Sequence, residues 1–244
     1  MHRPILILLM AAAVVAQSPT PPAFDAASIK PASPNSPLPH TFQFLPGGRL
    51  HVANTWIKFA IQQAYDLEDY QVVGGPPWLN SDDRYDIEAE AGGDATKDKM
   101  RLMLQTLLAE RCQLKAHRET RELPVYKLEV AKGGPRLMPL KAGERSKCTR
   151  ENSVICGIRT MAQLADWLKY VVRHPVFNRT EISGDYDVLI LFDTYEAEGQ
   201  PTPLGYDRPP LSTALVDQLG LRLEPTKEQI RVLVIDSVQH PSGN

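Results

Sequence analysis

Four stretches of the chain share one alternation of hydrophobic and polar positions. In each, a segment with apolar residues at helical spacing leads into a short apolar strand, a polar turn and a second strand. The second strands are the most similar segments, at residues 85–90, 126–131, 186–191 and 231–236. Three of them begin with a tyrosine, namely Tyr85, Tyr126 and Tyr186. A recurring unit of this kind predicts architecture but no reaction.

Four helices are predicted from the spacing and from residues suited to N-caps. Asn54 or Thr55 precedes the first helix, which extends from Trp56 to Ala64. Thr96 and Thr160 precede the second and third helices, whose apolar faces contain Met100 to Leu108 and Met161 to Leu168. The fourth and shortest predicted helix is Leu211 to Leu219.

The predicted strands complete the units. The first strand is Phe24 to Ile29, and residues 41–45 and 49–52 form a hairpin around Gly47 and Gly48. After the second helix, Cys112 to His117 is expected to pair with Val125 to Val130. After the fourth, Leu221 to Leu223 is expected to pair with Val232 to Val238.

These units predict an α+β fold of two lobes, with helices on one face of small, mainly antiparallel sheets. The first lobe would contain residues 24–140 and the second residues 153–244. Residues 141–152 are polar and irregular, and are predicted to form the linker.

The N-terminus has the pattern of an export signal. Arg3 is followed by the apolar run Ile5 to Val15, and small residues precede a cleavage site between Ala16 and Gln17. This predicts a signal peptide at residues 1–16, a flexible tether at 17–23, and a periplasmic or extracellular protein. A buried N-terminal helix or a retained anchor are the alternatives. No later segment is long and apolar enough to predict a transmembrane helix in the mature chain.

Composition and charge exclude two classes of partner. Hydrophobic residues make up 43% of the 244 residues and charged residues 23%, which is ordinary for a globular protein. Lys and Arg number 27 against 29 Asp and Glu, giving a net charge of −2. A nucleic-acid binder or a protein attracted to anionic lipid would have a basic surplus, so neither is expected.

The three cysteines are interpreted in an oxidising setting. Cys148 and Cys156 lie close together around a polar loop, and a disulfide between them would close that loop. Metal binding is the alternative, but no C-x-x-C pair is present. Cys112 lies within an amphipathic stretch and is predicted to be a free thiol in the core.

No local catalytic, cofactor or metal motif stands out, so no catalytic, cofactor or metal residue is predicted. The histidines of the mature chain form neither H-x-x-x-H nor H-E-x-x-H, and G-x-S-x-G is missing. His117 lies in a charged run that suggests a solvated turn. Asp82, Asp83 and Asp86 have oxygen ligands for calcium, but turn chemistry explains them more simply.

Several motifs together resemble a known family. They are F-D-A-A-S-I-K-P from Phe24, G-G-P-P-W-L from Gly74, R-Y-D-I-E-A from Arg84, L-L-A-E-R from Leu107 with E-T-R-E-L-P-V-Y from Glu119, and V-I-D-S-V from Val234. The chain resembles the uncharacterised exported proteins of domain-of-unknown-function family 3738, which are expanded in soil acidobacteria. This resemblance implies export and an unassigned function, with no catalytic residues to carry over.

The favoured hypothesis is a non-enzymatic binding or interaction module of the cell envelope, whose partner is an envelope protein or a glycan. One alternative is a hydrolase-type enzyme with a non-local site between the lobes. Another is a sensory ectodomain that works with a separate membrane peptidase.

Overall fold

The chain forms two compact units, each assembled from separate segments. The computed structural model describes residues 20–33, 39–141, 144, 157–194, 199 and 207–242. Unit 1 combines the chain up to Leu67 with Gly75–Lys115 and the chain from Ile235 onwards. Unit 2 combines Glu68–Gly74 with Ala116–Val234. The predicted α+β class is confirmed, since helices accompany small, mainly antiparallel sheets. The units do not coincide with the consecutive lobes predicted, 24–140 and 153–244.

Unit 1 is built on a four-stranded antiparallel sheet. Its strands are β1 (Ala26–Pro31), β5 (Tyr85–Glu90), β3 (Arg49–Thr55) and β2 (Thr41–Leu45), in that spatial order. The predicted hairpin is confirmed, because β2 pairs with β3 from Thr41↔Ala53 to Leu45↔Arg49. We call this four-stranded sheet of unit 1 sheet A.

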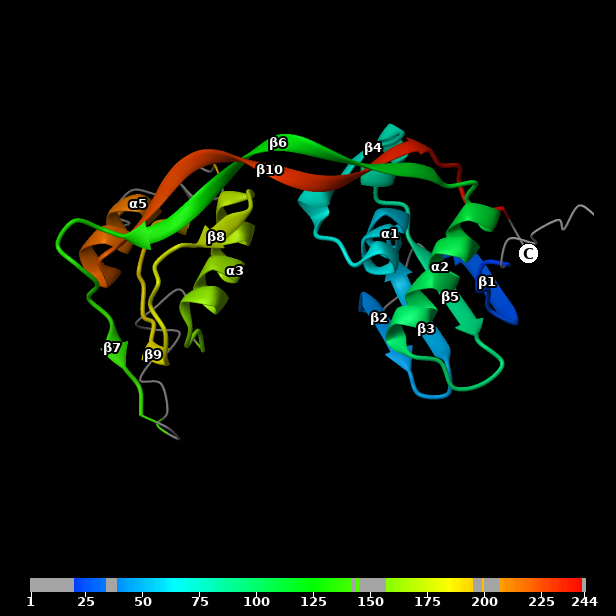
Figure 1. The fold of residues 1–244 in the computed structure, drawn as a ribbon, viewed down its shortest axis with the longest axis horizontal. Helices are drawn as coiled ribbons and strands as arrows, with labels where there is room; N and C mark the ends of the chain where they lie inside the picture. The colour runs from blue at the N-terminus through cyan, green and yellow to red at the C-terminus, as the bar shows by residue number, and fades with distance from the viewer. Residues whose placement is uncertain are drawn as a thin grey trace, which may run out of the picture. The chain divides into compact units, whose positions relative to one another are not determined.

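Two helices cover one face of sheet A, α1 (Ile57–Tyr65) and α2 (Lys97–Arg111) (Figure 1). Residues alternate along the central strand β5: Ile87 and Ala89 are buried, whereas Glu88 and Glu90 are exposed. Because successive side chains of a strand point to opposite faces, one face of sheet A joins the core and the other stays open to solvent.

The helix caps follow the predictions in part. The Thr96 hydroxyl accepts from the Lys99 amide at the start of α2. At α1, the predicted cap at Asn54 or Thr55 is wrong, because Trp56 is the N-cap residue and makes no side-chain cap bond. Thr55 instead bonds His40, with 2.5 Å between its hydroxyl and Nδ1.

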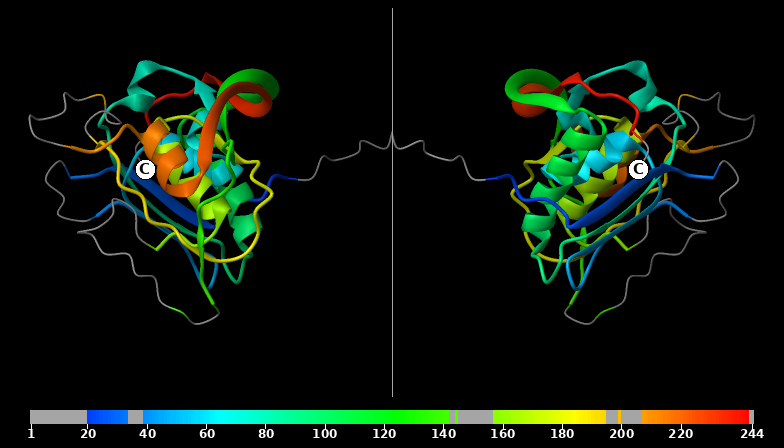
Figure 2. Two further views of the ribbon diagram at one scale, coloured as in Figure 1. Left: turned by 90° about the vertical axis from the view of Figure 1, so that its left-hand side faces the viewer. Right: turned by 90° about the vertical axis from the view of Figure 1, so that its right-hand side faces the viewer.

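Two predicted hairpins are single long strands. Lys115–Val130 forms β6 and Leu221–Ser237 forms β10, which pair with each other and coil side by side (Figures 1 and 2). They are antiparallel: beyond one end the Ala131 amide donates to Gly220 O, and beyond the other the Gln239 amide donates to Cys112 O. The predicted turns do not form, although each connecting segment contains a proline: Pro124 lies within β6 and Pro225 within β10, both in extended conformation.

Unit 2 places β6 and β10 in a sheet of order β4-β10-β6-β8, with β4 at Val72–Gly74 and β8 at Val176–Asn178. The strand β8 is parallel to β6. Helices α3 (Met161–Val172) and α5 (Leu211–Ala214) lie in this unit, followed by a π-helical turn, η3 (Leu215–Leu219). Thr160 caps α3 as predicted, and the short helix predicted at 211–219 is present.

The core of unit 2 surrounds α3. Its largest buried side chains are Leu128, Met161, Leu164, Leu168 and Phe192. The strand predicted from Tyr186 to Phe192 is shorter than expected, since only Tyr186–Asp187 forms β9, paired with β7 (Met138–Pro139). Val188, Ile190 and Phe192 still alternate into the core, which accounts for the strand-like pattern.

Short 3-10 turns complete the elements, η1 at Asp69–Gln71 and η2 at Pro77–Asn80. The predicted signal peptide at 1–16, its cleavage between Ala16 and Gln17, and the predicted disulfide between Cys148 and Cys156 lie outside the described residues. No helix in the described ranges combines the length and the apolarity needed to cross a membrane.

Candidate functional site

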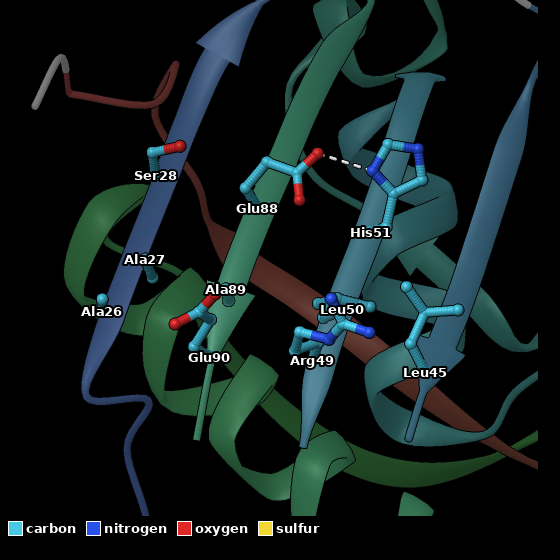
Figure 3. A pocket seen from close by; sticks show the side chains of 10 residues that line it. All are labelled: Ala26, Ala27, Ser28, Leu45, Arg49, Leu50, His51, Glu88, Ala89 and Glu90. Carbon is cyan, nitrogen blue, oxygen red and sulfur yellow. Dashed lines mark hydrogen bonds and ion pairs between the residues drawn. The ribbon is translucent and has the colours of Figure 1, made fainter. Parts of the chain in front are cut away.

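The solvent face of sheet A is hollowed by a cavity of about 600 Å³ (Figure 3). Figure 3 shows its side chains standing on β1, β5, β3 and β2, with the helices behind the sheet. The polar residues that line it are Ser28, Arg49, His51, Glu88 and Glu90. Leu45, Leu50 and three alanines complete the lining. The hollow is therefore polar, mixed in charge and built on regular strands.

Strand register arranges the polar side chains in two rows. In the first row, Ser28 faces Glu88, and Glu88 faces His51. In the second, Glu90 stands between Ala26 and Arg49. Residues two apart on a strand share a face, so both rows point into the same hollow. A rigid sheet thus holds two carboxylates, a guanidinium, an imidazole and a hydroxyl in fixed relative positions.

One contact links the first row. His51 Nδ1 lies 2.5 Å from Glu88 Oε1, and the two side chains are 40% and 62% exposed. Exposed ion pairs stabilise folded proteins by about 0–1 kcal/mol. This pair therefore does little for stability, but it fixes the imidazole so that Nε2 is the nitrogen left available. The side chains of Ser28 and Glu90 have no hydrogen-bond partner within the described part of the chain.

The order of the first row argues against a serine nucleophile. In a triad the imidazole lies between the hydroxyl and the carboxylate, because it must take the hydroxyl proton. Here Glu88 lies between Ser28 and His51, which puts the hydroxyl and the imidazole two strands, or about 9.5 Å, apart. The arrangement suits the holding of a ligand better than nucleophilic attack.

The other histidines have separate settings. His40 packs against the rings of Trp56 and Phe59. His240 stacks on Trp78 with 4.1 Å between ring centroids, and its Nδ1 lies 3.0 Å from the Tyr85 hydroxyl. These contacts are structural.

His117 lies on β6, with 3.6 Å between Nε2 and the Glu119 carboxylate. The solvated setting predicted for it is confirmed, although as part of a strand rather than a turn. The hydrogen bond from Arg121 lowers the pKa of the partly exposed Glu119 carboxyl. This charged run thus forms its own surface pairs.

The acidic residues at 82–86 serve the local backbone. The Ser81 hydroxyl donates to Asp83, Arg84 pairs with Asp82 at 3.4 Å, and Asp86 accepts the Asn54 amide at 2.8 Å. Across the residues that the structure describes, no group of three or more His, Cys, Asp or Glu side chains could hold a metal ion.

The tyrosines predicted at core edges pack as expected. Tyr85 is buried and reaches His240, and Tyr186 donates to Ser183 O at 3.1 Å. Tyr126 meets His174 edge to face at 5.8 Å. Burial, followed by the charge of Asp83, raises the pKa of the Tyr85 phenol. These residues support the framework and do not line the hollow on sheet A.

Cys112 is a free, fully buried thiol at the end of α2, as predicted. Burial raises its pKa to about 12. We expect the Cys112 peptide to resist iodoacetamide at pH 8 in the native protein, by about 100-fold or more relative to the urea-unfolded chain, because the thiolate is the nucleophile. Peptide-level mass spectrometry measures this ratio.

Because the pKa of the Cys112 thiol is raised in the folded protein, the free energy of unfolding should depend on pH. The unfolded thiol ionises near the ordinary value of 9.0, so its contribution to stability is complete below that pH. Above it, the free energy of unfolding should fall by about 1.4 kcal/mol per pH unit towards pH 12. Cys112→Ala should remove this contribution to the fall of the unfolding free energy with pH. An unchanged fall above pH 9 would contradict the raised pKa of Cys112.

Together, these observations define an α+β protein with a polar hollow on the solvent face of sheet A. A family model described as protein of unknown function (DUF3738) matches residues 58–238, and the chain belongs to this family. No curated protein and no solved structure shows significant similarity to the chain. The family model begins within α1, so it includes β5 with Glu88 and Glu90 but neither β1 nor β3.

No local sequence pattern distinguishes the residues of this hollow. His51 is one histidine among several, and Glu88 is one polar position in a strand. Alternation along each strand does put Arg49 and His51 on one face and Glu88 and Glu90 on another. These two faces coincide only because β3 pairs with β5, although α1, η1, β4 and η2 lie between the two strands in the chain.

Proposed function

We propose that this protein is a non-enzymatic binding module of the cell envelope and that the outer face of sheet A holds its ligand. The observation that carries the proposal is the pair of polar rows, Ser28–Glu88–His51 and Glu90–Arg49, over a hollow of about 600 Å³. Ligand sites usually have volumes of about 300–1,000 Å³. Export is supported by the signal-like pattern from Arg3 to Ala16.

The charges favour a neutral, hydroxyl-rich ligand. In the second row Glu90 stands beside Arg49, so a ligand with a single charge would meet a like charge there, and the Glu88 carboxylate of the first row would repel an anion. A hydroxyl group both donates and accepts, and therefore suits Glu90 and Arg49 at once. We infer that the ligand is an envelope glycan, with a protein partner as the competing outcome.

A sedimentation assay with insoluble cell-wall glycan tests the proposal. We expect the purified chain to co-sediment, and His51→Ala with Glu88→Ala to weaken binding about tenfold or more. Hydrogen bonds to charged groups contribute about 1.5–3 kcal/mol each, which supports this magnitude. The matched control removes one cation and one anion from exposed positions of α2, by Lys99→Ala with Glu110→Ala. It should bind as the unaltered protein does.

Three outcomes would count against the proposal. Equal binding by the His51/Glu88 variant would place the site elsewhere. Capture of an envelope protein, without any glycan retention, would overturn the ligand class. Hydrolysis of the glycan that disappears in the same variant would favour the enzyme alternative, in which His51 acts as a base towards water.

A further inference from the structure

Unit 2 contains a groove in which two cavities share one residue, Arg173. One cavity, of about 300 Å³, is lined by Arg173 together with Glu68, Asp69, Tyr70, Lys169, Tyr170 and His174. The other, of about 370 Å³, has walls from Tyr126, Val171, Leu211 and Leu223 beside Arg173. The rings of Tyr126 and His174 meet edge to face with 5.8 Å between centroids, so the cavities adjoin at a second point as well. We call this pair of cavities the Arg173 groove.

The charges at one end of the groove are already paired. Lys169 Nζ lies 3.0 Å from Glu68 and 2.6 Å from Asp166, and its side chain is only 15% exposed. Burial opposes the ammonium charge, but these two hydrogen bonds outweigh it and raise the pKa of Lys169. Lys169 is therefore a cation already satisfied by two carboxylates, and Glu68 is partly neutralised by it.

Arg173 is in a different position. It is exposed, and it directly follows the last residue of α3 with φ 53°. In the chain it lies between Tyr170 and His174, which line the same cavity. Within the described residues, its guanidinium has no ion pair or hydrogen bond. Guanidinium groups match the planar geometry of a carboxylate through two parallel hydrogen bonds. The two acidic lining residues, Glu68 and Asp69, both have partners, so Arg173 is the unpaired charge that the described part of the groove offers to a ligand.

His174 adds a second polar group at the same place. Its Nδ1 lies 2.8 Å from Val172 O, and because a carbonyl oxygen only accepts, Nδ1 must be the donor. Nε2 is then the nitrogen left for a ligand. It accepts when the ring is neutral and donates when the ring is protonated.

Apart from Asp69 and Ser212, the remaining walls are apolar or aromatic. Val171, Val172, Leu211 and Leu223 line one cavity, and the rings of Tyr70 and Tyr170 flank the other. Tyr170 is 70% exposed, which is unusual for a large aromatic side chain. Burial and the neighbouring Glu68 raise the pKa of the Tyr70 phenol, so it stays a neutral donor at physiological pH.

We propose that the Arg173 groove binds an amphiphilic monocarboxylate, with the carboxylate on Arg173 and an apolar body along the flanking walls. One unpaired cation beside apolar and aromatic walls complements a ligand with one anionic head and an apolar remainder. The proposal rests on residues of unit 2 alone, so its outcome is independent of glycan binding on sheet A. Alkyl and aromatic carboxylates share this chemistry.

Calorimetric titration with two probes tests the proposal and distinguishes alkyl from aromatic carboxylates. Octanoate represents alkyl carboxylates and phenylacetate represents aromatic ones. We expect at least one of them to bind with a Kd of about 1 mM or tighter, and 1-octanol, which lacks the charge, to bind about tenfold more weakly than octanoate. Binding of either acid supports the proposal and identifies the source by the tighter probe.

Substitutions locate the binding. Arg173→Gln should weaken binding of the preferred acid about tenfold or more. Arg173→Lys keeps the charge but not the planar guanidinium, so its affinity should lie between those of the unaltered protein and Arg173→Gln. Arg231→Gln is the matched control, because Arg231 is also an exposed arginine of unit 2 but lines neither cavity. Thermal unfolding checks that each variant is folded. Binding of neither acid at about 10 mM, or equal binding by Arg173→Gln, would overturn the proposal.

Discussion

Replacement of Ile87 by alanine should lower the free energy of unfolding by about 2–5 kcal/mol. Ile87 is 0% exposed at the centre of β5, where it faces Ile29 of β1 and Val52 of β3 in one register row. All three side chains belong to the helix-covered face, so truncation leaves a cavity that the neighbouring strands cannot easily close. Urea unfolding followed by circular dichroism measures the change.

The adjacent residue is the control for this result. Glu88 points to the opposite face of the same strand, so Glu88→Ala should change stability by less than about 1 kcal/mol. A small loss from Ile87→Ala, or a large loss from Glu88→Ala, would mean that the two faces of sheet A are assigned the wrong way round. The hollow in Figure 3 would then be part of the core.

Gly220→Ala should have the second large effect, a loss of about 3 kcal/mol or more and a fall in Tm of about 10 °C or more. Gly220 joins η3 to β10 with φ 64°, a conformation that costs an L-residue about 1–2 kcal/mol. A Cβ there would lie 2.2 Å from Gly134 O and 2.9 Å from Arg136 N. Because these are backbone atoms, the chain itself must shift to relieve the contact.

Gly134→Ala separates strain from contact. Gly134 also has a positive φ, 85°, but a Cβ there would meet nothing within 4 Å. Gly134→Ala should therefore lower the free energy of unfolding only by the cost of the positive φ, about 1–2 kcal/mol. Equal losses from the two variants would show that the close approach of residues 134–136 to Gly220 does not exist in solution.

Local chemistry predicted much of the secondary structure. Thr96 and Thr160 were recognised as caps because a hydroxyl before an apolar helical face satisfies a free amide, and both bonds are present. The β2–β3 hairpin followed from two short strands around Gly47 and Gly48, which both have a positive φ. In these cases all the determining residues lie within a few positions of one another.

The two wrongly predicted hairpins have one physical origin, which is long-range strand pairing. β6 and β10 were each predicted as two strands, because an isolated apolar pattern interrupted by charges resembles a hairpin. In the fold, the charged segments pair across the ribbon, as Lys227 does with Glu122 at 2.9 Å and Arg222 with Glu129 at 2.7 Å. A partner about a hundred residues away leaves no local signal.

The candidate site depends on the same kind of information. Ser28, His51 and Glu88 come from three strands that are separated in the chain by loops and by α1. Alternation indicates which way each side chain points, but only strand order and register bring them into one row. For this reason the sequence favours the hypothesis of a binding module but does not locate the face of sheet A proposed to bind.

An NMR titration with soluble cell-wall glycan fragments tests the central claim, that the outer face of sheet A is the binding surface. The ring signals of His51 report on the hollow, and those of His40 and His240 report on packed settings elsewhere in unit 1. The account predicts a saturable shift of the His51 signals, with smaller changes at His40 and His240. Saturable binding that leaves the His51 signals unmoved would contradict it.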